Sequence, residues 1–97
     1  MKELTIKAVW KQRYGAIPAL LLAYLLQAEP EDGEWFFAPV SGMHREWYVA
    51  ATEQQRAREL LVQDGTINVR EKAREGTAVV GYQYRINHDR IAEIESA

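Results

Sequence analysis

The stretch from Thr52 to Gly65 constrains the fold most, because it carries both a start signal and a stop signal for a single helix. Thr52 stands three residues before Gln55, which is the spacing of a capping box, in which each side chain bonds the backbone N–H of the other residue. Gly65 can take the left-handed conformation that ends a helix. The sequence therefore predicts one complete helix over about residues 52–64.

This predicted helix has two different surfaces. At about 100° per residue, Ala57, Leu60 and Leu61 fall on one stripe, which we expect to be buried. The opposite surface is polar and carries both amides and cations, and it consists of Gln55, Arg58, Glu59, Val62 and, on a flank, Arg56. A short helix with such a surface, followed by a turn and a hairpin, is typical of a recognition helix.

The length of the chain limits it to one domain. A chain of 97 residues buries only roughly 60–65% of its unfolded surface, which is too little for two cores. With 47% hydrophobic and 27% charged residues, the composition is that of a folded globular protein. The absence of cysteine excludes disulfides and thiolate metal sites, and it fits a reducing compartment.

No segment of the sequence has the length of a membrane span. The longest apolar run, Ala16–Leu26, has 11 residues and contains Pro18, whereas a bilayer core of about 30 Å requires roughly 20 residues. The N-terminal Met-Lys-Glu-Leu lacks the apolar region of a signal peptide. We therefore expect a cytoplasmic protein with no membrane partner.

The charge pattern tells against indiscriminate binding to nucleic acids. The formal net charge is −2 and the sequence pI is about 5.7, whereas such binding relies on a broad basic surface. Residues 52–74 contain five cations and four anions, a local balance of only +1. Any contact with DNA therefore depends on where these side chains point.

The segments before residue 40 predict an arm, a helix and a short strand. Residues 4–10 alternate apolar and polar side chains and predict a short strand or extended arm, although nothing in them breaks a helix, so a helix stays open as the alternative. Residues 16–28 have a helical apolar period and predict the central helix. After an acidic turn at 29–34, residues 35–37 predict a very short strand.

Two shorter helices are also predicted. Ser41 is expected to cap a helix over about 42–48, which a tight turn joins to the helix at 52–64. Asn87 is expected to cap a last short helix. The inward-facing pairs of these helices are Met43 with Trp47 and Ile91 with Ile94.

The residues after Gly65 predict a β-hairpin. Matching the apolar faces of its two strands places Val69 opposite Val80 and Ile67 opposite Tyr82, which leaves a four-residue loop at 73–76. The alternate face and the tip carry the cations of the hairpin, which are Arg70, Lys72 and Arg74.

The predicted order is helix, short strand, helix, turn, helix, hairpin and terminal helix. It is carried by Ala16–Leu26, Trp35–Phe37, Thr52-Glu-Gln-Gln-Arg-Ala-Arg-Glu-Leu-Leu, Asp64-Gly65-Thr66-Ile67 and Tyr84-Arg85-Ile86-Asn87. These segments resemble winged helix-turn-helix domains, most closely those of phage and plasmid replication initiators and replisome organisers. The resemblance implies one α+β domain over 1–97, with an arm or strand at 1–14 and a winged helix core at 15–95. That core would have three helices, a short strand, a two-stranded β-wing and a short C-terminal helix.

The resemblance further implies binding to double-stranded DNA, in replication initiation or transcription regulation. The helix at 52–64 would enter the major groove, where amides pair with adenine and guanidiniums with guanine or phosphate, and the tip of the wing would touch the neighbouring backbone or minor groove. Three of these side chains also have a role that needs no DNA. Gln55 can cap the helix, and Arg56 and Arg58 can be solvated side chains that pair with nearby acidic residues. The expected contact set is Thr52, Gln54, Gln55, Arg56 and Arg58 on the helix and Arg70, Lys72 and Arg74 on the hairpin.

Catalysis has no support in the sequence. The chain contains no HExxH motif, no phosphate-binding glycine loop and no pattern of a nucleophile with a base. His44 and His88 are expected to be surface polar groups, and Trp10 is expected to be partly exposed or at an interface. We therefore expect a protein that is not an enzyme and that has no cofactor and no metal site.

Two other functions fit the same residues. The first is a winged-helix module for protein–protein interaction or dimerisation that uses Val62, Trp10 or the N-terminal segment and binds no DNA by itself. A homodimer, or a complex with a replication or regulatory protein, is also compatible with the DNA-binding hypothesis. The second is a phage-type inhibitor that mimics a host surface, which only the small size and the acidity suggest.

Overall fold

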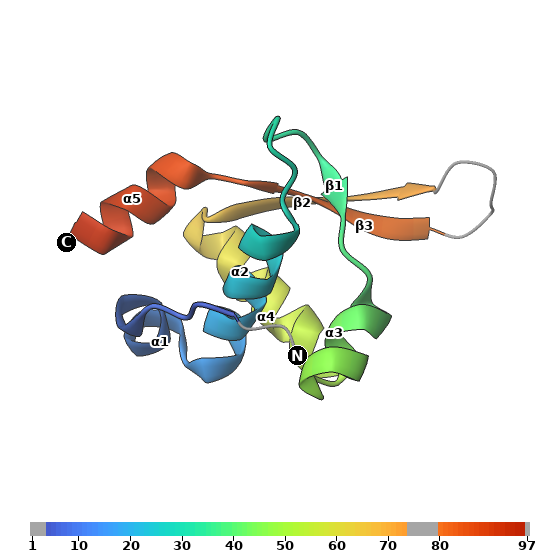
Figure 1. The fold of residues 1–97 in the computed structure, drawn as a ribbon, viewed down its shortest axis with the longest axis horizontal. Coiled ribbons are helices and arrows are strands. Elements are labelled where there is room, and N and C mark those ends of the chain that lie inside the picture. The colour runs from blue at the N-terminus through green and yellow to red at the C-terminus, as the bar shows by residue number, and fades with distance from the viewer. Residues whose placement is uncertain (1–3, 74–79, 97) are drawn as a thin grey trace.

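A computed structural model describes residues 4–73 and 80–96 and shows an α+β fold, in which helices pack against a three-stranded antiparallel sheet (Figure 1). The predicted α+β class is therefore confirmed. In chain order the elements are α1 (Ala8–Tyr14), α2 (Ala16–Ala28), β1 (Phe36–Phe37), α3 (Val40–Trp47), α4 (Ala51–Asp64), β2 (Ile67–Ala73), β3 (Val80–Ile86) and α5 (His88–Ser96).

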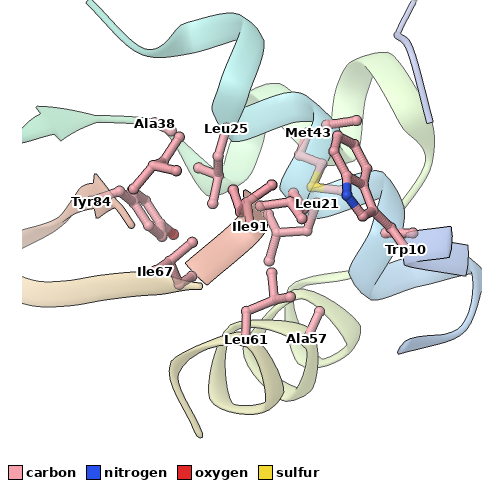
Figure 2. Packing of buried hydrophobic residues seen from close by; sticks show 14 of the residues in the cluster. Trp10, Leu21, Leu25, Ala38, Met43, Ala57, Leu61, Ile67, Tyr84 and Ile91 are labelled. Atoms are coloured by element: carbon pink, nitrogen blue, oxygen red, sulfur yellow. The ribbon is translucent and has the colours of Figure 1, made fainter. Parts of the chain in front are cut away.

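The core forms where α2 and α4 meet the sheet. Leu21 and Leu25 of α2 lie in one buried cluster with Leu61 of α4 and with Ile67 and Tyr84 of the sheet. Figure 2 shows Leu61 and Ala57 directed from α4 toward these side chains. The predicted helix over residues 16–28 is confirmed with its predicted bounds. It is also central, as predicted, because its buried residues lie on more than one of its faces.

The strand order in the sheet is β1–β3–β2, and both pairings are antiparallel. The predicted register was wrong, because Val69 faces Tyr84 rather than Val80, and Ile67 faces Ile86 rather than Tyr82. Both registers put the apolar residues of the two strands on the same face, so periodicity cannot separate them. Tertiary packing decides between them: the observed register buries Tyr84, which also pairs with Phe36 of β1.

The predicted loop at 73–76 was wrong at its start, because Ala73 belongs to β2 and pairs with Val80. The rest of that loop, including Arg74, lies outside the described residues.

A short strand or extended arm was expected over residues 4–10, with a helix as the alternative. Residues 4–7 belong to no helix or strand and α1 starts at Ala8, so the strand was wrong and the helical alternative is confirmed for residues 8–10. The helical alternative wins because it buries the indole of Trp10, whose Nε1 donates a hydrogen bond to Glu95 Oε1 of α5 at 3.2 Å. Trp10 was expected to be partly exposed or at an interface, but it is only 4% exposed and belongs to the core, so this expectation was also wrong. The helix α1 packs against both α2 and α5.

Two of the four predicted helix signals are confirmed. Gly65 takes the left-handed conformation (φ 85°) and its N–H bonds the last carbonyls of α4, while Asn87 Oδ1 accepts a bond from the Arg90 N–H at the start of α5. The caps assigned to Ser41 and to Thr52 with Gln55 were wrong. Both helices begin earlier, after Pro39 and Ala50 in extended conformations, so Ser41 and Thr52 lie inside the first turn and neither is the capping residue.

Asp64, the last residue of α4, joins three helices. Its carboxylate accepts hydrogen bonds from Arg13 Nη2 at 2.9 Å, Tyr14 Oη at 2.5 Å and Arg90 Nη2 at 3.3 Å. The Arg13 hydrogen bond is the largest cause that lowers the pKa of Asp64 from 3.8 to about 2. Burial, and then the hydrogen bond to Asp64, raise the pKa of Tyr14 to about 12.

No helix in residues 4–73 or 80–96 is long and apolar enough to cross a membrane.

We predict that Asp64→Asn lowers the free energy of unfolding at neutral pH by about 1–3 kcal/mol, because hydrogen bonds to charged groups contribute this much. The folded-state pKa of Asp64 lies below its usual 3.8, so this stabilisation is complete above about pH 4 and is lost as the pH falls toward 2. Urea titrations at pH 7 and pH 2.5 measure the effect. Glu31→Gln, an exposed change in the acidic turn, is the control, and an equal loss of stability at both pH values would contradict the prediction.

Candidate functional site

The junction between α3 and α4 presents an exposed aromatic ring. Tyr48 ends α3 with a left-handed backbone (φ 56°, ψ 34°), and its N–H donates to the His44 carbonyl at 2.9 Å. Its side chain is 88% exposed. A non-glycine residue in this conformation costs about 1–2 kcal/mol, so the fold maintains a strained backbone under a ring that is almost fully exposed.

The sequence analysis missed Tyr48. A local signal was present in the sequence: Tyr48 stands at the end of the predicted helix, at the position where glycine commonly takes the left-handed conformation that ends a helix.

Gln54 fixes this junction from inside. The residue is only 2% exposed, and its Nε2 donates to the carbonyl oxygens of Val40 at 3.0 Å and Val49 at 2.9 Å. Both amide hydrogens are therefore used, one at the start of α3 and one in the turn before α4. Gln54 was expected among the DNA-contacting residues, but in this structure its amide is committed to the protein itself.

Arg58 also lies inside the protein, although it was expected on the outward surface of the helix. It is 7% exposed, its Nη1 donates to Tyr84 Oη at 3.5 Å, and its Cζ lies 4.3 Å from the centre of the Tyr82 ring. Leu60, expected in the buried stripe, is 38% exposed. The buried stripe of α4 is therefore rotated toward the hairpin and consists of Gln54, Ala57, Arg58 and Leu61.

The N-terminal half of α4 keeps three of the expected residues at the surface. Thr52, Gln55 and Arg56 are exposed. Gln55 Nε2 donates a long bond of 3.4 Å to Glu59 Oε1. Within the described part of the chain, Thr52 and Arg56 have no side-chain hydrogen bond or ion pair, so both are available to a ligand.

The cations of the hairpin lie on the other face of the sheet. Val69 lines a groove with α4, and because side chains alternate along a strand, Arg70 and Lys72 point to the opposite face. The guanidinium of Arg70 lies 4.2 Å from the Trp35 ring, and its Nε donates to Gln83 Oε1 at 2.8 Å. Lys72 is exposed. The structure therefore does not gather the expected residues into one cationic surface.

A groove of about 350 Å³ separates α4 from the inner face of the hairpin. We call it the α4–hairpin groove. Val62, which is 44% exposed, forms part of its wall. Its lining residues are Gln55, Arg58, Glu59, Val62, Gln63, Val69 and Tyr82.

The described residues contain no group of three or more histidine, cysteine, aspartate or glutamate side chains that could hold a metal ion. His44 and His88 are both exposed, as expected. His88 Nε2 lies 2.8 Å from Glu29 Oε1 and so joins the acidic turn to α5.

Comparison of the chain with protein-family models, with curated proteins and with solved structures finds no match. The function must therefore be argued from the geometry alone.

We predict that Gln54→Ala destabilises the protein by about 1–3 kcal/mol, because it leaves the buried carbonyls of Val40 and Val49 without their donor. Thermal unfolding followed by circular dichroism measures the loss. The neighbouring exposed residue offers a matched control, and Gln55→Ala should change the stability by less than about 0.5 kcal/mol. Equal effects of the two substitutions would show that Gln54 does not hold the junction together.

Proposed function

We propose that the protein is a winged helix-turn-helix domain that binds double-stranded DNA, in replication initiation or transcription regulation. In this assignment α2, α3 and α4 are the three-helix core, and β2 with β3 is the wing. The order of elements and the sheet order β1–β3–β2 support it, because this fold places a short strand between its first two core helices beside the hairpin. The helix α1 is then an addition before the core.

The observation that carries the proposal is the free surface at the start of α4. Thr52, Gln55 and Arg56 project from its first two turns, and Tyr48 projects from the turn before it. The N-terminal part of a recognition helix is the part that approaches base edges. Figure 1 shows the hairpin extending past the helices on the side where α3 lies.

The residue types at this surface suit a duplex. The Arg56 guanidinium can bond a guanine or a phosphate in bidentate fashion, and the Gln55 amide can pair with adenine if it leaves its long bond to Glu59. The Tyr48 hydroxyl can donate to a phosphate oxygen. The start of a 14-residue helix adds partial positive charge and free N–H groups. Lys72, on the hairpin, provides a second contact to the backbone.

The set of cations on this interface is smaller than the sequence suggested, because Arg58 is buried and Arg70 bonds Gln83 and stacks on Trp35. With two or three phosphate contacts, the logarithm of the binding constant should fall with the logarithm of salt concentration at a slope of about −2 to −3. The affinity for duplex DNA should therefore be modest, and it should fall as the salt concentration rises. A second domain or a dimer partner would strengthen it.

We predict that Arg56→Ala weakens binding to a random-sequence duplex at least several-fold at low salt, reduces the salt slope by about 1, and leaves the stability nearly unchanged. Fluorescence anisotropy across a salt series measures both values. Arg85→Ala is the matched control, because Arg85 is also an exposed arginine but lines a hollow with Gly33 and Asp89 near the acidic turn. Equal affinity of the wild-type and Arg56→Ala proteins would refute the proposal.

We also predict opposite effects of Tyr48→Gly on stability and on binding. Glycine adopts the left-handed backbone without strain, so the free energy of unfolding should rise by about 1 kcal/mol. Affinity for DNA should fall, because the exposed hydroxyl is lost. Thermal unfolding and anisotropy on the same preparation test the two parts. A variant that loses stability and keeps its DNA affinity would contradict both.

One observation favours a second candidate function, a winged-helix module that binds protein. Leu60 and Val62 are both substantially exposed on α4, where a helix that reads only DNA gains nothing from apolar side chains. Absence of DNA binding at low salt, together with a concentration-dependent dimer in light scattering, would favour this candidate over the first.

A further inference from the structure

The α4–hairpin groove contains a buried cation, Arg58, that forms no ion pair with an acidic side chain of the described residues. Arg13 and Arg90 both pair with Asp64. Arg58 is more deeply buried, yet among residues 4–73 and 80–96 it has no carboxylate within ion-pair distance. Arg58 Nη1 donates a long hydrogen bond to the Tyr84 hydroxyl at 3.5 Å, and the guanidinium stacks on the ring of Tyr82. A buried guanidinium in this state is poised for an anion from outside.

Arg58 has N–H groups to spare on the side of the groove. A guanidinium has five N–H donors, and the hydrogen bond to Tyr84 uses only one. In the described part of the chain, Trp47 Nε1 is the one fully buried side-chain polar atom that lacks a partner. The remaining Arg58 nitrogens are therefore not completely enclosed, and Arg58 is part of the lining of the groove.

The walls of the groove suit an apolar group that lies beside this anion. Val62, Val69 and Tyr82 supply aliphatic and aromatic surface, and the Gln55 and Gln63 amides stand at the rim. Glu59 is also at the rim, and Glu71 is exposed on the same face of β2 as Val69. These two carboxylates repel a polyanionic backbone with regularly spaced phosphates, whereas a single carboxylate directed at Arg58 can pass between polar amides.

We propose that the α4–hairpin groove binds an acidic peptide segment of a partner protein. A glutamate or aspartate side chain of that segment accepts two hydrogen bonds from Arg58, which is the strongest geometry available to a guanidinium. An adjoining apolar side chain lies on Val62, Val69 and Tyr82. Such a short, partly apolar contact is typical of a peptide that docks beside a helix.

This inference does not rest on DNA binding. Arg56, which carries the proposed DNA contact, lines a different hollow with Ile17, Pro18 and Leu60, on the side of α4 that faces α2. The two surfaces of one helix can therefore be altered separately. A protein that binds both ligands would connect a DNA site to another component of the same assembly.

The test is a titration of the isotope-labelled full chain, followed by NMR, with the blocked peptide acetyl-Leu-Glu-Leu-amide. The expected result is saturable shifts of the Arg58 Nε–H and of the Val62 and Val69 methyl groups. The isosteric acetyl-Leu-Gln-Leu-amide should bind about fivefold or more weakly, because a neutral acceptor makes the weaker bond to a guanidinium. No shift at these groups with millimolar peptide, or equal affinity for the two peptides, would overturn the proposal.

Paired variants locate the site. Val62→Glu places an anion in the groove, where it repels the acidic peptide and can itself pair with Arg58, so it should abolish the shifts; Leu60→Glu makes the same change on the opposite flank and should leave them intact. Arg58→Met, with folding checked by the dispersion of the amide spectrum, should remove the preference for the glutamate peptide. Equal losses in the two glutamate variants would place binding elsewhere.

Inorganic phosphate and the Arg56→Ala variant separate the two proposals. Inorganic phosphate that produces the same shifts as the glutamate peptide, at equal or lower concentration, would reassign the groove to the phosphates of a nucleic acid and overturn the peptide proposal. Arg56→Ala should leave peptide binding unchanged while it weakens binding to DNA. Loss of both activities in this variant would show that the two surfaces are not independent and would contradict the assignment of a separate peptide site.

Discussion

The packing of α4 against α2 and the sheet is the constraint on which the rest of the structure depends. Ala57 and Leu61 must face Leu21 and Leu25 for the core to close, and this fixes the rotation of α4 about its own axis (Figure 2). Once this rotation is set, Gln54 and Arg58 lie on the flanks of the buried stripe and are drawn inside. The same rotation leaves Thr52 and Arg56 exposed to solvent.

The polar side chains around this packing differ in how fully their hydrogen bonds are satisfied. The Gln54 amide is satisfied in full by two carbonyls, and Asp64 is surrounded by donors from α1 and α5. Both arrangements hold elements together, the Gln54 bonds in the interior and the Asp64 bonds near the surface. Arg58 is the exception, because its partners are one distant hydroxyl and the face of a ring. The difference separates residues that stabilise the fold from a residue that remains available to a ligand.

The difference between satisfied and available side chains reduces the set of residues that can contact DNA. Of the eight residues expected to contact DNA, Thr52, Gln55, Arg56 and Lys72 are exposed, and Tyr48 joins them. Gln54 and Arg58 are buried and Arg70 is engaged on the outer face of the sheet, while Arg74 lies outside the described residues. The proposed DNA interface is therefore small and has few free cations, and the α4–hairpin groove is a separate surface for the proposed peptide.

The sequence by itself determined the elements whose signals are local. The central helix at 16–28, the helix ending at Gly65, the cap at Asn87 and the alternation of β2 could all be predicted, because they depend on periodicity and on single residues with strong backbone preferences.

Tertiary structure alone decided the hairpin register, the helical state of α1 and the rotation of α4. Each of these is a choice between alternatives of nearly equal local energy. The burial of Tyr84 settled the first, the burial of Trp10 settled the second, and the packing of α4 against α2 settled the third. The exposed surface of α4, and with it the candidate site, is therefore a product of packing that no pattern within residues 52–64 encodes.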